Sequence, residues 1–274
     1  MSSDPTRTDP QELLALAVDL VRRAGELVRK GRVDGLGQIG RKSTPTDLVT
    51  AMDRASEQLV VAGLLAARPD DAVLGEEGGS RTGTSGVRWL LDPIDGTVNY
   101  VYGLPQYAVS LAAEVDGAVV AGVVHNPESG EEWTATRGGG AWRAGRRLSG
   151  PQTTSVAQSL VGTGFGYDAR QRAAQARVVA ALLPEVRDIR RFGSAALDLC
   201  FVAEGRLDAY YESGLNPWDS AAGGLVAEEA GVLVTGLRGA PAGPALTLAA
   251  PPALHGPLHD RLVELAADTV LPAD

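Results

Sequence analysis

Two aspartates, Asp92 and Asp95, lie three residues apart at the end of the apolar run 89–91. Pro93 and Gly96 favour a tight bend around them, so a strand that ends there would direct both carboxylates into one small volume. Two carboxylates this close repel each other and lose hydration, and cations are the most direct compensation. Hard divalent ions such as Mg²⁺ prefer oxygen ligands, so the spacing favours a site for such ions.

Further acids stand upstream, at Glu76 and Glu77, and downstream, at Asp219. Adjacent residues on an extended segment point in opposite directions, so only one of the two glutamates can be a direct ligand and the other would face solvent or lie behind it. The structural alternative for the Asp-Pro motif is a turn followed by an Asp cap on a helix that begins near Thr97. Because the other acids are also present, the sequence predicts a metal-dependent phosphate-ester hydrolase.

These residues belong to a longer series of motifs that resembles the inositol monophosphatases, in the superfamily of lithium-sensitive, magnesium-dependent phosphatases. The resemblance extends from about Leu13 to about Leu265, nearly the whole chain. The Asp-Pro-Ile-Asp-Gly-Thr run is highly specific alone, and the other motifs follow in the family's order. They are Lys42-Ser43, Asp47-Leu48-Val49-Thr50 with Asp53, Gly75-Glu76-Glu77, the run 89–97 with Asn99, Gly193-Ser194-Ala195-Ala196, Tyr210-Tyr211-Glu212, Trp218-Asp219 and Glu229-Ala230-Gly231.

The resemblance implies a fold of the α+β or α/β class, a layered αβαβα sandwich with the metal site between its two halves. It implies that Asp92 bridges two Mg²⁺ ions, and that Glu76 and the carbonyl of Ile94 complete the first site. Asp95 and Asp219 would hold the second ion. The expected complement is roughly two to three Mg²⁺ ions per subunit.

Two interpretations of Asp53 stay open. The segment Thr50-Ala-Met-Asp53 matches a capping box at a helix N-terminus, which would make Asp53 structural. The resemblance implies instead that Asp53 and Thr97 orient and deprotonate the attacking water, so that the catalytic residues are Asp53, Thr97, Glu76 and Asp92. The two roles are compatible, because a short acid in a first helical turn can cap the helix and still face the site.

The substrate would be held from both halves of the chain. The segment Gly193-Ser194-Ala195 opens a helix, whose free N–H groups and small side chains let polar substrate atoms approach closely. The resemblance implies that Glu212 and Asp95 bind polyol hydroxyls. For Asp219 there is also a structural alternative, because an acid after Asn-Pro fits the first turn of a helix. The expected substrate-binding set is Asp95, Gly96, Thr97, Gly193, Ser194, Ala195, Glu212 and Asp219.

The substrate most directly implied is a myo-inositol monophosphate, hydrolysed by a metal-activated water to inositol and phosphate. Histidinol phosphate and fructose 1,6-bisphosphate are alternatives within the same superfamily. The segment Tyr210-Tyr211-Glu212 resembles the inositol-phosphate branch more than the histidinol branch. A protein-interaction role on the same fold is the non-enzyme alternative, although the acids Glu76, Asp92, Asp95 and Asp219 are all present.

The composition indicates a soluble globular chain of 274 residues, with 44% hydrophobic and 22% charged residues. A net charge of −9 disfavours direct binding of nucleic acid, whereas bound metal ions would let an acidic protein accept a phosphate ester. No apolar stretch approaches the ~18 residues of a membrane span, and residues 1–10 lack the apolar segment of a signal peptide. The single cysteine, Cys200, fits a reducing cytoplasm, and the resemblance implies lithium inhibition and a homodimer.

Hydrophobic periodicity divides the chain into two halves, residues 1–150 with most metal ligands and residues 151–274 on the substrate side. In the first half the pattern predicts helices over 11–30 and 50–67, and a β-meander over 108–148. In the second half, alternating strands and helices predict an α/β arrangement. Its expected helices cover 169–183, 194–203 and 218–229, with a last helix from about Leu254.

Overall fold

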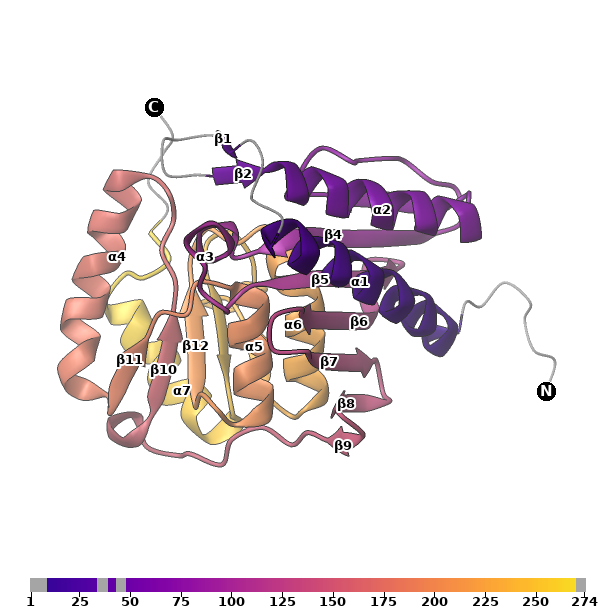
Figure 1. The fold of residues 1–274 in the computed structure, drawn as a ribbon. Helices are drawn as coiled ribbons and strands as arrows, with labels where there is room; N and C mark the ends of the chain where they lie inside the picture. The colour runs from indigo at the N-terminus through magenta and orange to yellow at the C-terminus, as the bar shows by residue number, and fades with distance from the viewer. Residues whose placement is uncertain (1–8, 34–38, 43–47, 270–274) are drawn as a thin grey trace, which may run out of the picture.

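The computed structural model describes residues 9–33, 39–42 and 48–269. In this part of the chain two β-sheets alternate with three pairs of helices, so that the elements form five layers (Figure 1). The layered αβαβα sandwich is therefore confirmed. No helix of these ranges is both long and apolar enough to cross a membrane.

The first sheet has seven strands in the order β3-β4-β5-β6-β7-β8-β9. Strands β3 and β4 run parallel, and every later neighbour pairs antiparallel, which confirms the predicted meander. The strands are β3 (Ala72–Gly75), β4 (Val87–Asp95), β5 (Ala108–Val115), β6 (Ala118–Asn126), β7 (Glu131–Thr136), β8 (Gly140–Arg143) and β9 (Arg146–Arg147). A separate antiparallel pair consists of β1 (Ile39–Arg41) and β2 (Leu48–Thr50).

The second sheet has five strands in the order β11-β10-β12-β14-β13. Strand β10 pairs parallel with β11 and β12, and β14 pairs antiparallel with β12 and β13. The strands are β10 (Leu160–Thr163), β11 (Asp188–Arg190), β12 (Ala209–Glu212), β13 (Leu233–Thr235) and β14 (Thr247–Ala250).

Helices α1 (Pro10–Val33) and α2 (Ala51–Ala67) cover the outer face of the first sheet. Helix α1 turns a stripe that includes Leu13, Leu20 and Val28 toward the protein interior, as expected from its helical periodicity. Burial of each such side chain stabilises the folded state by about 1.5–3 kcal/mol. Helices α4 (Ala169–Leu182) and α7 (Pro252–Glu264) cover the outer face of the second sheet.

Helices α5 (Ala195–Glu204) and α6 (Pro217–Glu229) lie between the two sheets (Figure 1). Because α5 has a sheet or a helix on every side, all residues from 195 to 203 are buried. Cys200 is among them, fully buried with a free thiol, and burial raises its pKa well above the usual value. The cysteine is an inert core residue.

The chain passes from the first sheet to the second between β9 and β10, through the short 3₁₀ helix η1 (Val156–Gln158). The predicted division after residue 150 falls on this connection. One hydrophobic cluster nevertheless contains side chains from both sides, such as Leu90, Trp133, Phe201 and Leu225. The division into two domains therefore stays a prediction.

Strand β4 is second from the edge of the first sheet, with α2 on one face and α6 on the other, and this explains its nearly continuous burial. Its start is fixed by Asp71, which accepts hydrogen bonds from the Trp89 indole at 2.8 Å and from the Ser85 hydroxyl at 2.6 Å. The pairing with β5 shifts register between Asp92 and Asp95. This irregularity directs the end of β4 toward the space between the two halves.

Candidate active site

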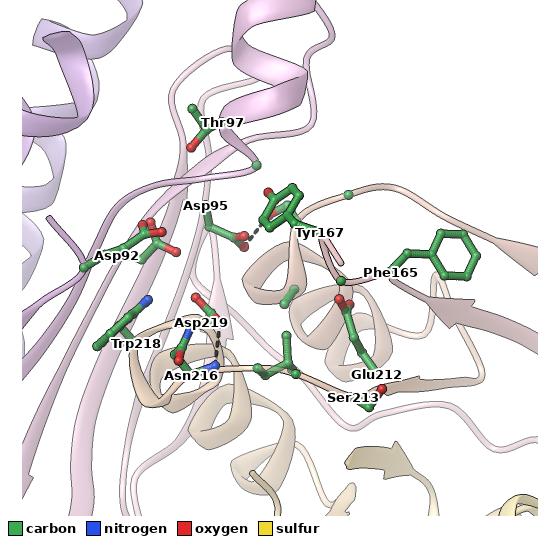
Figure 2. A pocket seen from close by; sticks show the side chains of 18 of the residues that line it. Asp92, Asp95, Thr97, Phe165, Tyr167, Glu212, Ser213, Asn216, Trp218 and Asp219 are labelled. Carbon is green, nitrogen blue, oxygen red and sulfur yellow. Dashed lines mark hydrogen bonds between the residues drawn. The ribbon is translucent and has the colours of Figure 1, made fainter. Parts of the chain in front are cut away.

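A cavity of about 430 Å³ opens where β4, β12 and the N-terminal ends of α5 and α6 meet. Figure 2 shows Asp92 and Asp95, from the end of β4, facing the same space as Asp219 from the start of α6. Glu212, from the end of β12, approaches from the other side of the cavity. Other lining residues from the predicted set are Glu76, Ile94, Gly96, Thr97, Gly193, Ser194 and Ala195.

Asp92 is the most buried acid that lines the cavity, with 2% of its surface exposed. Its Oδ1 accepts a hydrogen bond from the N–H of Ile94 at 3.0 Å, which is the local turn that Pro93 favours. Burial raises the pKa of Asp92 well above its usual value, and the charges of Glu76, Asp95 and Asp219 add to the shift. Four acids that repel one another in a buried space require positive charge nearby.

Asp95 connects the two halves of the chain. Its Oδ2 accepts hydrogen bonds from the Ser194 hydroxyl at 2.6 Å and from the N–H of Ala196 at 2.7 Å, both at the start of α5. Burial raises the pKa of Asp95 to about 6, against these two hydrogen bonds, which lower it. The carboxylate is thus already oriented by the first turn of a helix whose sequence position is about one hundred residues away.

Asp219 stands in the first turn of α6 and also lines the cavity. Its Oδ2 accepts a hydrogen bond from the N–H of Asn216 at 2.7 Å, as a residue of a helical first turn does. It also lines the cavity, where burial and the charge of Asp95 raise its pKa well above the usual value. Capping α6 therefore holds this carboxylate in the site.

Glu76 follows β3 and lies beside Lys42. The Lys42 ammonium is 2.8 Å from Oε1 of Glu76 and also contacts the carboxylate of Glu77. Burial opposes the charge of Lys42, but the two carboxylates raise its pKa above the usual value. The expectation that Glu77 points away from Glu76 is therefore wrong, because the two residues lie in a turn and not on an extended segment.

Glu57, on the buried face of α2, is a site-supporting residue that the sequence analysis missed. Its carboxylate accepts hydrogen bonds from the N–H groups of Glu77 at 2.9 Å and Gly79 at 2.7 Å. It holds the turn that carries Glu76. The signal available in the sequence was its spacing of one helical turn from Asp53, which places both acids on one face of α2.

Asp53 completes a capping box and also contacts Thr97. One oxygen, Oδ2, accepts from the N–H of Thr50 at 2.7 Å and from its hydroxyl at 2.6 Å. The other, Oδ1, accepts from the hydroxyl of Thr97 at 3.0 Å. Burial raises the pKa of Asp53, and the hydrogen bonds from Thr50 oppose that shift. The structure thus brings together two residues that are 44 positions apart in the sequence.

Gly96 adopts a left-handed conformation with φ of 92°, which ends β4 and begins α3 (Thr97–Tyr102). A Cβ atom there would lie 2.9 Å from the carbonyl oxygen of Gln106 and 3.0 Å from that of Gly193. Only glycine fits this position. The carbonyl of Ile94 accepts a hydrogen bond from the Thr97 hydroxyl at 3.1 Å, so Thr97 contacts both Asp53 and the end of β4.

Glu212 accepts a hydrogen bond from the Tyr210 hydroxyl at 2.5 Å. Burial raises the pKa of Glu212 to about 7, while Tyr210 and the charge of Arg191 lower it. Behind it lies Asp198, a second acid that the sequence analysis missed, whose pKa is raised well above normal by burial and by Glu212. Oδ1 of Asp198 is buried and has no hydrogen-bond partner among the described residues.

In the ranges that the structure describes, no three His, Cys, Asp or Glu side chains form a ready metal-binding cluster. The chemistry of the donors nevertheless fits a hard divalent cation. Asp92 is buried among three like charges, and the donors around it are the carboxylate oxygens that Mg²⁺ prefers. Ser43 and Asp47, from the family motifs, lie outside the described residues.

The fold and the site define the class of protein: an αβαβα sandwich whose two sheets enclose an acid-lined cavity. The model of the inositol monophosphatase family matches residues 9–270. This chain belongs to the inositol monophosphatase family.

Named relatives and solved structures agree with this assignment. Inositol-1-monophosphatase SuhB of Mycobacterium tuberculosis is 46% identical over 268 residues, covering 90% of this chain and 92% of the relative. The Nus factor SuhB of Escherichia coli is 39% identical, covering 83% of this chain and 86% of the relative. The solved structure of M. tuberculosis SuhB has a TM-score of 0.80 over 94% of this chain and 98% of its own, and that of a Thermotoga maritima IMPase has 0.85 over 94% and 99%.

Proposed function

We propose that this protein is a Mg²⁺-dependent phosphatase that hydrolyses a phosphate monoester, most directly a myo-inositol monophosphate. The observation that carries the proposal is the gathering of Glu76, Asp95 and Asp219 around the fully buried Asp92. Relatives 46% identical to this chain carry the name inositol-1-monophosphatase, which supports the substrate. The retention of all these acids favours the enzyme over a purely protein-binding role.

Five residues would hold the metal ions. Glu76, Asp92 and the carbonyl of Ile94 form one site, and Asp92, Asp95 and Asp219 form another, for roughly two to three Mg²⁺ ions per subunit. When bound, these ions supply Lewis-acid polarisation of the phosphoryl group and a lowered pKa for water. They would also neutralise the charge that raises the pKa of Asp92.

Asp53 and Thr97 would position the attacking water and accept its proton. The Thr97 hydroxyl can donate a hydrogen bond to Oδ1 of Asp53, at 3.0 Å, or to the carbonyl of Ile94, at 3.1 Å. When it donates to one acceptor, its lone pairs remain available to a water. Oδ2 of Asp53 is already held by Thr50, so Oδ1 is the atom that would receive the proton.

The polyol would lie on the side of the cavity lined by Glu212. Its buried carboxylate is held by Tyr210 and can accept hydrogen bonds from substrate hydroxyls. Gly193, Ser194 and Ala195 lie along the same wall at the start of α5, where small side chains leave room for a sugar-sized group. The other expected contacts are Asp95, Gly96, Thr97 and Asp219.

A homodimer in the cytoplasm is also part of the proposal. Val33, Tyr102 and Leu104 expose 81%, 75% and 50% of their surface. They belong to one region, because Arg32 at the end of α1 lies beside Gly103. Light scattering on the purified protein measures the assembly, and Tyr102→Glu should shift a dimer toward monomer if this apolar patch is the interface.

A substrate screen tests the proposed reaction. Purified protein with Mg²⁺ should release phosphate from inositol 1-phosphate faster than from histidinol phosphate, fructose 1,6-bisphosphate or glycerol phosphates. The matched control is Asp92→Asn, which keeps the side-chain shape and should lose nearly all activity. Absence of phosphate release from every ester by the wild-type protein would refute the proposal.

A further inference from the structure

Arg191 is the feature of the cavity that the proposed reaction leaves unused. The residue is exposed and lines the cavity, on the side of Asp95 and Glu212, whose pKa values its charge lowers. No carboxylate of the described residues lies within ion-pair distance of it. Its sequence neighbour Arg190 differs, because Nη1 of Arg190 is 2.6 Å from the carboxylate of Asp188.

Two contacts direct the Arg191 side chain toward the cavity. Its guanidinium carbon lies 5.8 Å from the centre of the Phe165 ring, a cation–π distance. Its Nη1 lies 2.3 Å from the position that a Cβ of Gly193 would occupy, so the side chain runs along the bare backbone of that glycine. Both Phe165 and Gly193 line the same cavity.

The charge of Arg191 reaches the polyol side of the site. Burial is the main cause that raises the pKa values of Asp95 and Glu212, and Arg191 opposes it at both residues. The guanidinium is nevertheless not bonded to either carboxylate, and its donors have no hydrogen-bond partner among residues 9–33, 39–42 and 48–269. A planar guanidinium binds anionic oxygens through paired hydrogen bonds more effectively than it binds hydroxyls.

We propose that Arg191, backed by Phe165, forms a subsite for a second anionic group on the substrate. The inference rests on the proposed phosphatase function and names a substrate class for it: polyol phosphates that carry a second phosphate beyond the hydroxyls held by Glu212. The phosphate to be cleaved would lie at the metal ions that Asp92, Asp95 and Asp219 would hold, and the second phosphate would lie at Arg191.

The test compares two substrates that differ by one phosphate, inositol 1-phosphate and inositol 1,4-bisphosphate, with ³¹P NMR to identify which ester is cleaved. A charged hydrogen bond of this kind corresponds to roughly a tenfold to hundredfold change in affinity. Arg191→Gln should therefore lower the ratio of kcat/KM for the bisphosphate to that for the monophosphate by about tenfold or more. Arg191→Lys keeps the charge and should retain most of the ratio.

Arg190→Gln is the matched control, because it removes the same charge from the adjacent residue, which is paired outside the cavity. It should leave the ratio unchanged. An unchanged ratio in Arg191→Gln would overturn the subsite. If kcat/KM fell equally for both substrates, Arg191 would instead act at the cleaved phosphate or support the whole site.

Binding separates this inference from the proposed function. Calorimetry with Ca²⁺ as the cation measures the Kd of each compound without requiring turnover, and the bisphosphate should lose its advantage in Arg191→Gln alone. If the wild-type protein cleaves neither compound, the proposed function fails, while the two Kd values still decide the subsite. Equal weakening of both Kd values would refute the subsite even in an active enzyme.

Discussion

Replacing Asp53 with Asn separates the capping role of this residue from its proposed role in activating water. Asn has the same size and can place its amide oxygen where Oδ2 now accepts two hydrogen bonds from Thr50, at 2.7 and 2.6 Å. Its amide nitrogen would then face the Thr97 hydroxyl, 3.0 Å from Oδ1. That hydroxyl can accept from the amide and donate to the carbonyl of Ile94, at 3.1 Å. The variant therefore keeps the hydrogen bonds to Thr50 and one hydrogen bond to Thr97.

The expected effects on stability and turnover differ widely. Because the hydrogen bonds with Thr50 and Thr97 are kept, the free energy of unfolding should fall by no more than about 1 kcal/mol. Burial raises the pKa of Asp53, so the charged carboxylate itself costs stability at neutral pH, and Asn removes that cost. Turnover should fall by about 100-fold or more, because the amide cannot accept a proton from water.

The assay measures kcat at saturating Mg²⁺ and the free energy of unfolding in urea for Asp53→Asn, Thr97→Val and the double variant. Thr97→Val removes the hydroxyl from Oδ1 and from the Ile94 carbonyl and should cost about 1–3 kcal/mol of stability. If both residues act on one water, the losses in turnover should be less than additive. Near-normal turnover in Asp53→Asn would refute the reasoning and leave Asp53 as a cap alone.

Three further predictions concern stability, geometry and metal. Burial raises the folded pKa of Glu212 to about 7. The protonated side chain therefore contributes its full stability below the ordinary pKa of 4.5, and the free energy of unfolding falls as pH rises from there through 7. Glu212→Gln should gain up to about 3 kcal/mol relative to wild type over that range, and a difference independent of pH in urea titrations would contradict this. Gly96→Ala should cost about 2–3 kcal/mol in thermal unfolding, because its φ of 92° and the carbonyl of Gln106 leave no room for a Cβ. Excess EDTA should abolish phosphate release and added Mg²⁺ restore it, with millimolar lithium inhibitory; full turnover in EDTA would exclude the metal mechanism.

Local features of the molecule were predictable from the sequence. The apolar periodicity of residues 11–30 identified α1, which extends over Pro10–Val33, and the turn signals after residue 108 identified the meander. Asp92 and Asp95 were recognisable because three residues of strand and turn determine their separation. Each of these features depends on side chains close together in the chain, where backbone geometry alone fixes the distance.

Contacts between distant segments were decided only by the tertiary structure. Asp95 binds the start of α5 at Ser194, and Arg191 crosses Gly193 to reach Phe165. No spacing in the sequence indicates either contact. Glu77 joins Lys42 because the chain turns after β3, contrary to the extended geometry that was predicted. Periodicity determines which face of an element is buried, but not which distant side chain it meets. Which distant side chains meet depends on how the sheets and helices pack. The motifs therefore determined the acids of the site, and the packing of α5 between the sheets determined which neighbours orient them.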